Sequence, residues 1–319
     1  MCRAYGGPDV VSIQTVETPS PRENELLVRV VASTVNRTDC GIRSASPRAA
    51  IRLMYGLRHP RRPILGSAFA GQVEVVGPAV RGIEPGDHVF GFDDRRLGGH
   101  SEYLTMPVSA AVSTIPDGVA EAEAAASTEG AHYALTYIER ADVRPGQQVL
   151  VYGASGAVGT AAVQLLVARG AVVTAVAATK DLDLMRRLGA ARVIDYTSED
   201  YTTTGTDFDL VFDAVGKTSF RTCERLLRDG GYYMATEFGP RLANLRLSVT
   251  TRFRGRCRVA FPLPLNARRH VAAVRAALAD ATFRPVIDRT YALDDIVEAY
   301  RYVETGQKTG NVVLTVSGR

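Results

Sequence analysis

The stretch that decides the fold reads Gly153-Ala154-Ser155-Gly156-Ala157-Val158-Gly159. An apolar run, Val149 to Tyr152, precedes it, and a helix-periodic stretch, Val158 to Ala168, follows it. A glycine turn between a strand and a helix offers a tight bend, an unobstructed backbone and a helix N-terminus, which together suit a pyrophosphate. Glycine spacing alone is weak evidence, but this succession of strand, turn and helix is the context that a dinucleotide site requires. The stretch therefore predicts a nucleotide-binding unit.

Strand and helix signals alternate along the rest of this region. Apolar runs typical of strands lie at Val172 to Ala177, Val193-Ile194, Leu210 to Phe212 and Tyr232 to Ala235, and helical stretches lie at Leu182 to Leu188 and Ser219 to Leu227. Strict alternation of this kind predicts a parallel, doubly wound sheet, so the expected fold class is α/β.

The first 115 residues have a different character. Short alternating or β-branched runs, Leu26 to Val31, Gly71 to Val76 and Asp87 to Phe90, are separated by glycine and proline turns. This pattern predicts a partly open barrel of antiparallel strands. An alanine-rich helical stretch begins after Ile115-Pro116-Asp117-Gly118, and we place the domain boundary there.

Composition excludes several classes of protein. The chain has 319 residues, of which 46% are apolar and 23% charged, as in globular rather than disordered or fibrous proteins. The net charge is +4, and almost all of the cationic residues are arginine, which does not indicate nucleic-acid binding. No apolar run approaches the roughly eighteen residues of a membrane span, and no signal peptide is evident, so we expect a cytoplasmic protein without a membrane segment. The scattered cysteines, Cys2, Cys40, Cys223 and Cys257, predict free thiols rather than a zinc site or disulfides.

The end of the second predicted strand bears on the choice of nucleotide. It reads Ala177-Ala178-Thr179-Lys180, where an NAD-dependent enzyme commonly carries an acid for the ribose 2′-hydroxyl. The cation of Lys180 and the hydroxyl of Thr179 instead favour the 2′-phosphate of NADP. Two alternatives stay open: Thr179 could cap the following helix with Lys180 a solvated charge, and Asp181 lies close enough to weaken the argument.

A further set of motifs runs along nearly the whole chain. They are Tyr5-Gly6-Gly7-Pro8, Val35-Asn36-Arg37-Thr38-Asp39, Ile64-Leu65-Gly66, Gly86-Asp87-His88-Val89-Phe90-Gly91, Gly146 to Gln164, Leu188-Gly189-Ala190, Asp213-Ala214-Val215-Gly216 and Lys308-Thr309-Gly310-Asn311-Val312-Val313. In these motifs the chain resembles the zinc-free medium-chain dehydrogenases/reductases of the quinone oxidoreductase, or zeta-crystallin, type. The resemblance implies a GroES-like catalytic domain (residues 1–115 and 271–319), a Rossmann NADP-binding domain (116–270) and a homodimer.

The resemblance also implies where NADPH binds. Gly156, Ala157 and Val158 would follow the pyrophosphate, and Thr179, Lys180 and Tyr196 would surround the 2′-phosphate. Val215, Phe261 and Asn311 would lie near the nicotinamide or its ribose, with Asn36 facing the same end. Ser155 and Thr128 complete the predicted cofactor-binding set.

The residues at the sequence positions of the catalytic zinc ligands favour chemistry without a metal. In the zinc alcohol dehydrogenases of the same superfamily, a cysteine precedes the Thr-Asp pair and a Gly-His-Glu follows. Here those places hold Asn36 and Gly66-Ser67-Ala68, so we predict no metal site. Without zinc to stabilise an alkoxide, reduction of a conjugated acceptor is easier, because its product delocalises the negative charge. We therefore expect an NADPH-dependent reductase of a small-molecule quinone or α,β-unsaturated carbonyl compound.

The proton donor is open, because tyrosines that the family often carries are replaced here by Gly41 and Pro47. One candidate is Tyr55, which could alternatively pack a surface loop. Another is the pair Glu129 and His132, three residues apart on one helix face, acting as a proton relay. In the alternative interpretation, Glu129 caps or forms a salt bridge locally and His132 is a packed side chain.

Two other functions stay open at this point. The arginine-rich segment Pro240 to Pro264 would suit a tailoring enoyl reductase that acts on a CoA- or carrier-bound substrate. The missing tyrosines would instead suit a non-catalytic protein that senses NADPH.

Overall fold

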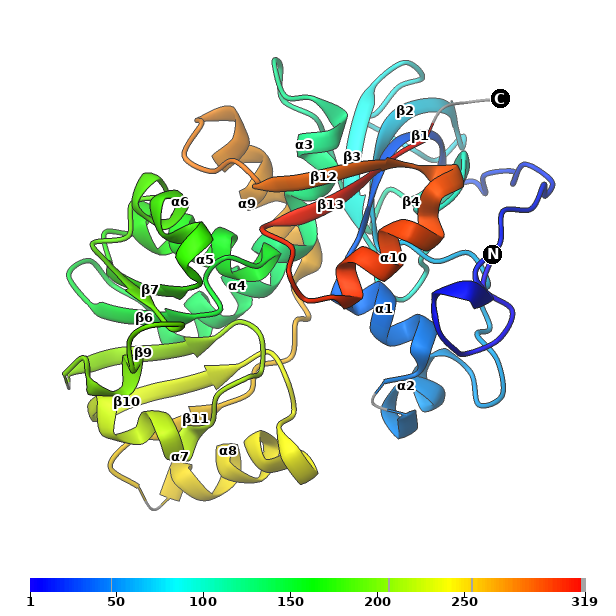
Figure 1. Cartoon of the computed structure of the whole chain (residues 1–319). Coiled ribbons are helices and arrows are strands. Elements are labelled where there is room, and N and C mark those ends of the chain that lie inside the picture. The colour runs from blue at the N-terminus through cyan, green and yellow to red at the C-terminus, as the bar shows by residue number, and fades with distance from the viewer. Residues whose placement is uncertain (47, 206, 254, 317–319) are drawn as a thin grey trace. The chain divides into compact units, whose positions relative to one another are not determined.

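The chain folds into two compact units in the computed structural model, which describes residues 1–46, 48–205, 207–253 and 255–316 (Figure 1). The first unit comprises Met1–Glu129 and Ala267–Arg319, and the second comprises Gly130–Asn266. Pro47, one of the two positions that lack the family's tyrosines, lies outside the described residues.

The first unit is built around a seven-stranded sheet. Its strands are β1 (Glu25–Val35), β2 (Ala68–Val76), β3 (His88–Phe92), β4 (Tyr103–Pro107), β5 (Ala111–Thr114), β12 (Ile287–Ala292) and β13 (Asn311–Thr315). The strand order is β12-β13-β1-β2-β3-β5, β4 pairs with β1, and neighbours are antiparallel except for β12 and β13. Leu26 on β1 lies opposite both Val76 on β2 and Met106 on β4. The predicted β-rich, GroES-like first unit is confirmed.

In the described part of the first unit, five α-helices pack beside this sheet or follow its strands. They are α1 (Arg37–Ser44), α2 (Arg48–Tyr55), α3 (Glu121–Ala126), α9 (Ala267–Ala279) and α10 (Ile296–Glu304). Helix α1 begins directly after β1, because the Asn36 N–H donates to Asp39 Oδ2 at 3.0 Å, as in a capping box. The helix ends at Ala45, whose φ of 56° lies in the left-handed region. The cap fixes Asn36 and Thr38 at the end of β1.

The boundary between the units differs from the expected one. The sequence places it near residue 116, whereas the first unit extends to Glu129. The intervening helix α3 contacts β1, β2 and β13 of the first unit and buries Ala124, Ala125 and Ala126. An alanine-rich stretch predicts a helix but not which sheet covers it, and here the sheet of the first unit does.

The second unit contains a six-stranded parallel sheet of order β11-β10-β9-β6-β7-β8. Its strands are β6 (Gln148–Tyr152), β7 (Val172–Ala177), β8 (Arg192–Asp195), β9 (Phe208–Asp213), β10 (Leu227–Ala235) and β11 (Arg258–Ala260). Its helices are α5 (Ala157–Ala168), α6 (Leu182–Arg187), α7 (Phe220–Cys223), α8 (Ala243–Phe253) and most of α4 (Thr128–Ala141), and α7 and α8 lie beside β10 and β11 (Figure 1). The predicted doubly wound parallel sheet is confirmed.

The central strands of this sheet are apolar because both of their faces are covered. Val149, Leu150 and Val151 of β6 are fully buried, and every residue of β9 is buried. This is why β6 and β9 read in the sequence as continuous apolar runs rather than as alternating ones.

Two further sequence expectations can be compared with the structure. Among the described residues, no helix is long and apolar enough to cross a membrane. The four cysteines are buried free thiols, as predicted. Burial raises the pKa of the Cys40 thiol to about 12, so this thiol stays protonated.

Candidate functional site

The predicted nucleotide-binding residues of the second unit meet at one edge of its sheet. Because the six strands are parallel, their carboxyl ends lie together, and ligands of open α/β sheets bind beyond that edge. The glycine turn follows β6, Thr179 and Lys180 follow β7, Tyr196 follows β8, Val215 follows β9 and Phe261 follows β11. The register pairs Tyr152 at the end of β6 with Val176 and Asp213 on the neighbouring strands. The fold therefore brings these separate segments to one edge.

The glycines of the turn have different roles. Gly153 has a φ of +73°, and a Cβ there would lie 2.5 Å from the Val215 side chain. A Cβ on Gly159 would collide with the Gly153 carbonyl oxygen and the Ala154 backbone. Gly156, at the N-cap of α5, has open space, since a Cβ there would lie 3.8 Å from its nearest neighbour. Gly153 and Gly159 thus allow close packing, and Gly156 leaves the backbone accessible to a pyrophosphate.

A carboxylate to which the sequence analysis assigned no role lies at the ribose end of this edge. Asp195 ends β8, and its register partner is Ala177 at the end of β7. Its Oδ2 accepts a hydrogen bond from Thr179 Oγ1 at 2.6 Å, and its Oδ1 accepts from the Thr197 N–H at 2.9 Å. These hydrogen bonds, from Thr179 first and then Thr197, hold the pKa of Asp195 below its ordinary value.

This arrangement changes the role expected for Thr179. The hydroxyl hydrogen predicted for a 2′-phosphate is donated to Asp195 in the structure. The capping alternative is wrong, because the N-cap residue of α6 is Asp181, whereas a contact of Thr179 with the 2′-phosphate stays a prediction. Thr179 therefore orients Asp195.

Lys180 and Tyr196 remain suited to hold a 2′-phosphate. The Lys180 side chain is 53% exposed, with its Nζ 3.8 Å from Asp181 Oδ1, and the Tyr196 side chain is half exposed. An exposed ammonium and a phenol that follow neighbouring strands can both donate hydrogen bonds to phosphate oxygens. These residues are compatible with NADPH, since the glycine turn would face the pyrophosphate and Lys180 would face the additional phosphate.

A buried turn holds the Val215 position. The carboxylate of Asp213, at the end of β9, accepts from the N–H groups of Val215, Gly216 and Thr218 at 3.1, 2.8 and 3.0 Å. Burial nevertheless raises the pKa of Asp213, with these hydrogen bonds opposing the shift. The turn keeps Val215 against Gly153, while the ring centre of Phe261 lies 4.9 Å from that of Phe238.

The first unit contains a buried carboxyl group at the end of β1. Glu129 Oε1 accepts from Thr38 Oγ1 at 2.6 Å, and its Oε2 accepts from Asn36 Nδ2 at 2.8 Å and from Ser67 Oγ at 3.2 Å. We call Glu129 with these three donors the Glu129 cluster. Glu129 is 6% exposed, and Asn36 Oδ1 has no hydrogen-bond partner among the described protein atoms. Sequence reasoning selected Asn36 and Glu129 separately and did not predict that they touch.

Charged groups near the Glu129 cluster influence its ionisation. Burial raises the pKa of Glu129, the neighbouring Asp39 carboxyl raises it further, and the three donors oppose the shift. Burial also raises the pKa of Asp39, opposed by backbone N–H groups such as that of Asn36. Burial lowers the pKa of Lys308 to about 8, opposed by the charge of Glu129.

The remaining predicted residues lie apart from these contacts. His132 Nε2 is 3.3 Å from the Pro264 carbonyl oxygen, and the Thr128 hydroxyl donates to the Ala125 carbonyl at 3.0 Å. Asn311 is buried and donates through Nδ2 to the Val286 carbonyl at 3.1 Å. Tyr55 is half buried against the core of the first unit, where burial raises its pKa. A relay between Glu129 and His132 and a role for Tyr55 stay predictions.

The places of the zinc ligands hold hydrogen-bond donors. Asn36 and Ser67, which stand where zinc relatives have cysteine and histidine, both donate to Glu129. Within the described ranges, no three His, Cys, Asp or Glu side chains are grouped so that they could hold a metal ion. The donor set of this cluster therefore fits the two accepting oxygens of a carboxyl group.

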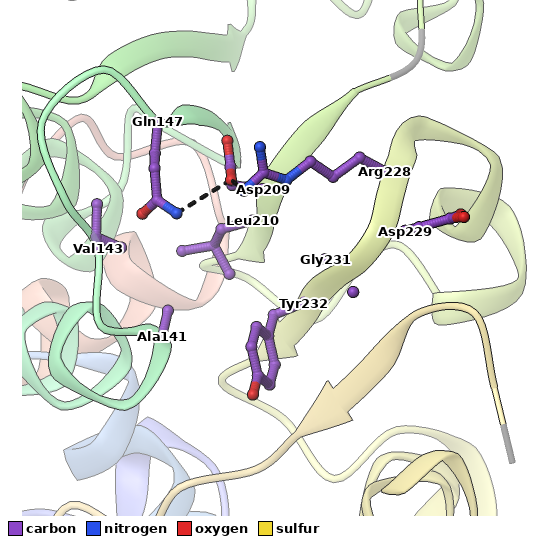
Figure 2. Close-up of a pocket in the computed structure, with 10 residues that line it drawn as sticks. Ala141, Val143, Gln147, Asp209, Leu210, Arg228, Asp229, Gly231 and Tyr232 are labelled. Atoms are coloured by element: carbon purple, nitrogen blue, oxygen red, sulfur yellow. Dashed lines mark hydrogen bonds and ion pairs between the residues drawn. The ribbon is translucent and has the colours of Figure 1, made fainter.

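A pocket of the second unit lies at the opposite edge of its sheet (Figure 2). It is lined by Asp209 at the start of β9, by Gln147 just before β6 and by Arg228 on β10. Asp209 accepts from Gln147 Nε2 at 3.0 Å and from the Gln148 N–H at 2.8 Å, and it pairs with Arg228. These contacts connect the first residues of β6, β9 and β10. We therefore assign the pocket a structural role.

Comparison with known proteins finds relatives over nearly the whole chain. Residues 22–117 match the alcohol dehydrogenase GroES-like domain family, and residues 188–314 match a family described as zinc-binding dehydrogenase. A 2-methylene-furan-3-one reductase of Solanum lycopersicum is 28% identical, over 97% of this chain and 76% of the relative. The mitochondrial NAD(P)H oxidoreductase RTN4IP1 of Mus musculus is 30% identical, over 92% and 82%.

A solved structure shows the same fold. The quinone oxidoreductase of Coxiella burnetii aligns with a TM-score of 0.86 at 25% sequence identity, covering 99% of this chain and 98% of that protein. The zinc-binding description belongs to the match over residues 188–314, whereas Asn36 and Ser67 lie in the GroES-like match. The comparisons thus agree with both units.

Proposed function

We propose that this chain, which belongs to the zinc-free medium-chain dehydrogenases/reductases of the quinone oxidoreductase type, uses NADPH to reduce a quinone or an α,β-unsaturated carbonyl compound. The observation that carries the proposal is the sheet edge of the second unit, where the glycine turn, Lys180 and Tyr196 converge. Bound at this edge, NADPH supplies a hydride. The chain itself binds and orients the nucleotide.

The choice of NADPH rests on charge. Lys180 offers a cation beside the ribose end, and NADPH-dependent enzymes are among the chain's relatives. Asp195 lies at the same end, but its two carboxylate oxygens are already engaged by Thr179 and Thr197. A carboxylate that accepts from hydroxyl groups of the protein is less available for a ribose hydroxyl, which supports NADPH over NADH.

The choice of substrate rests on the Glu129 cluster. Asn36 and Ser67 provide no Lewis acid at the metal-ligand places, so the acceptor must stabilise the arriving negative charge by itself. Quinones and α,β-unsaturated carbonyl compounds do so by delocalisation. The names of the tomato and Coxiella relatives, a methylene-furanone reductase and a quinone oxidoreductase, correspond to these two acceptor types.

The oligomeric state and the location are part of the proposal. We propose a homodimer. It is supported by the position of β11, which is an outermost strand of the parallel sheet and could pair with a strand of a second copy. We also propose a cytoplasmic location, supported by the four buried free thiols. Size-exclusion chromatography with light scattering tests the dimer.

The arginine-rich segment gives limited support to an anionic substrate. Arg256 pairs with Asp229 at 3.0 Å, and the Arg258 guanidinium lies 6.0 Å from the centre of the Tyr232 ring. These two cations are therefore engaged within the second unit. An enoyl thioester remains an acceptor to be tested beside neutral ones.

The test is NADPH oxidation in the presence of a chelator, with an ortho-quinone, a panel of enones and an enoyl thioester as acceptors. Turnover with NADPH exceeding that with NADH supports the proposal, and the preferred acceptor separates quinone from alkene reduction. Tight NADPH binding without turnover of any acceptor would contradict it and favour a sensing protein.

A further inference from the structure

Glu129 occupies an unusual position for a carboxyl group. It stands on α4 at the last residue of the first unit's segment, is 6% exposed, and accepts hydrogen bonds on both of its oxygens. The donors are two hydroxyl groups, of Thr38 and Ser67, and one amide, of Asn36. An interior carboxyl with hydroxyl neighbours can take up a proton from one of them or return it.

Thr38 is the donor best placed to pass a proton onward. It stands in the first turn of α1, its hydroxyl lies 2.6 Å from Glu129 Oε1, and its residue is partly exposed. With Glu129 ionised, this hydroxyl donates to the carboxylate. With Glu129 protonated, the direction of the hydrogen bond can reverse, and the Thr38 hydrogen is then available to a bound molecule.

The charged groups around Glu129 have other contacts, which distinguish their structural roles from the proton-binding role of Glu129. Asp39, on α1, engages its Oδ2 with the Asn36 N–H and thereby caps the helix. Lys308, before β13, directs its Nζ to the Gly310 carbonyl, and Arg37, Cys40 and Asp288 act on it electrostatically. His132, one turn along α4, has its Nε2 beside the Pro264 carbonyl. Asp39 thus caps α1, whereas the hydrogen bonds that Glu129 accepts from described residues come from the cluster's two hydroxyl groups and one amide.

We propose that Glu129 stores the proton that the reduction consumes and delivers it through the Thr38 hydroxyl to the reduced substrate. The inference rests on the proposed function. Once the acceptor holds the hydride, it is an enolate or a hydroquinone anion. Its basic carbon or oxygen takes the Thr38 hydrogen, Thr38 takes the Glu129 proton, and Glu129 is left as a carboxylate that solvent reprotonates. One hydride and one proton then reduce each acceptor. Glu129 is therefore a positioning residue that acts through Thr38.

Burial and the Asp39 charge raise the pKa of Glu129, so a protonated fraction persists toward neutral pH. The step needs the acid form. We therefore expect kcat to fall as pH rises through the pKa of Glu129, while Lys308 titrates on the alkaline side, with its pKa lowered to about 8.

The test compares Glu129→Gln with the matched control Glu25→Gln, which changes another buried glutamate of the first unit that pairs with Arg96. The amide oxygen introduced by Glu129→Gln still accepts from Thr38, but the amide holds no exchangeable acid proton. For this variant we expect a loss of kcat of about 10²-fold or more, disappearance of the pH limb and an unchanged KM for NADPH. Thr38→Ser should retain activity and Thr38→Val should lose it.

A second measurement does not depend on turnover. Infrared spectra of the unliganded protein should show the carbonyl band of a protonated carboxyl group that disappears as pH rises, and Glu129→Gln should remove that band while Glu25→Gln keeps it. Wild-type turnover with an unaltered pH profile in Glu129→Gln would overturn the inference and leave the proposed function standing. Absence of wild-type turnover would overturn the proposed function and the inference with it.

Discussion

The carboxylate of Asp195 accepts a hydrogen bond from the hydroxyl of Thr179 at 2.6 Å, although the two residues belong to different strand ends. Thr179 follows β7 and Asp195 ends β8, and the parallel register places Ala177 beside Asp195. A negative charge is therefore fixed at the ribose end of the nucleotide edge, where Lys180 supplies a cation. We therefore expect the nucleotide preference of this chain to depend on the balance between these two charges.

Replacing Asp195 by asparagine should improve the use of NADPH. Asparagine can still accept from Thr179, but it removes a negative charge that opposes the 2′-phosphate. Because the neighbouring Lys180 and Tyr196 are half exposed and solvent screens the charge, we expect a roughly two- to fivefold lower KM for NADPH. The KM for NADH, which lacks that phosphate, should change little. Steady-state kinetics with both nucleotides measure the difference, and an equal fall in both KM values would count against it.

Replacing Lys180 by alanine should have the opposite effect. A hydrogen bond to a charged group contributes about 1.5–3 kcal/mol, and the half-exposed side chain reduces this to about 1 kcal/mol, or roughly a fivefold higher KM for NADPH. Arg169→Ala is the control, since Arg169 is an exposed cation at the far end of α5. An NADPH-to-NADH preference that stays at the wild-type value in Lys180→Ala would refute the assignment.

Two alanine substitutions in the glycine turn should separate packing from binding. A Cβ at Gly159 meets backbone atoms of Gly153 and Ala154, so Gly159→Ala should destabilise the protein by about 1–3 kcal/mol. Gly156 has a φ of −74° and open space, so Gly156→Ala should cost no more than the roughly 0.5–1 kcal/mol of a weaker N-cap. Its methyl group would instead obstruct the pyrophosphate and weaken NADPH binding.

Denaturant unfolding and fluorescence titration with NADPH measure these two effects. The paired result matters more than either value, because a general defect in folding would lower both stability and affinity in both variants. If Gly156→Ala bound NADPH as tightly as the wild type, the pyrophosphate would have to lie elsewhere.

The elements of the nucleotide unit could be predicted because their signals are local. The apolar run of β6, the glycine turn and α5 follow one another within residues 148–168, and each reads clearly by itself. The role of Asp195 could not be predicted in this way. It depends on the register between β7 and β8, which no spacing in the sequence reveals.

The contacts of the Glu129 cluster were even harder to predict from the sequence than the role of Asp195. Glu129 and Asn36 are 93 residues apart, and helical spacing pointed from Glu129 to His132 instead. The contacts that the structure gives Glu129 come from α1 and from the residue before β2, which only the tertiary fold brings there. The unit boundary was predicted near residue 116 but lies after Glu129, because composition does not show which sheet buries α3.

The stability of the chain in acid should depend on His100. This histidine is buried, its Nε2 lies 2.8 Å from the Thr34 carbonyl oxygen, and Tyr300 packs edge-on against its ring. Burial lowers the pKa of His100 to about 4, with the Thr34 hydrogen bond opposing the shift. Below about pH 6.5 the unfolded chain therefore binds a proton that the folded chain accepts only near pH 4, and stability falls across this window.

The size of this effect is up to about 3 kcal/mol, because each pKa unit corresponds to about 1.4 kcal/mol. His100→Gln removes the titrating ring, so the variant should lose less unfolding free energy than the wild type between about pH 7 and about pH 4.5, whatever its stability at neutral pH. The control is His88→Gln, since His88 is exposed and pairs with Glu121 at 2.7 Å. Urea unfolding at the two pH values measures the difference, and equal losses in wild type and His100→Gln would show that His100 is protonated at no cost in the folded chain.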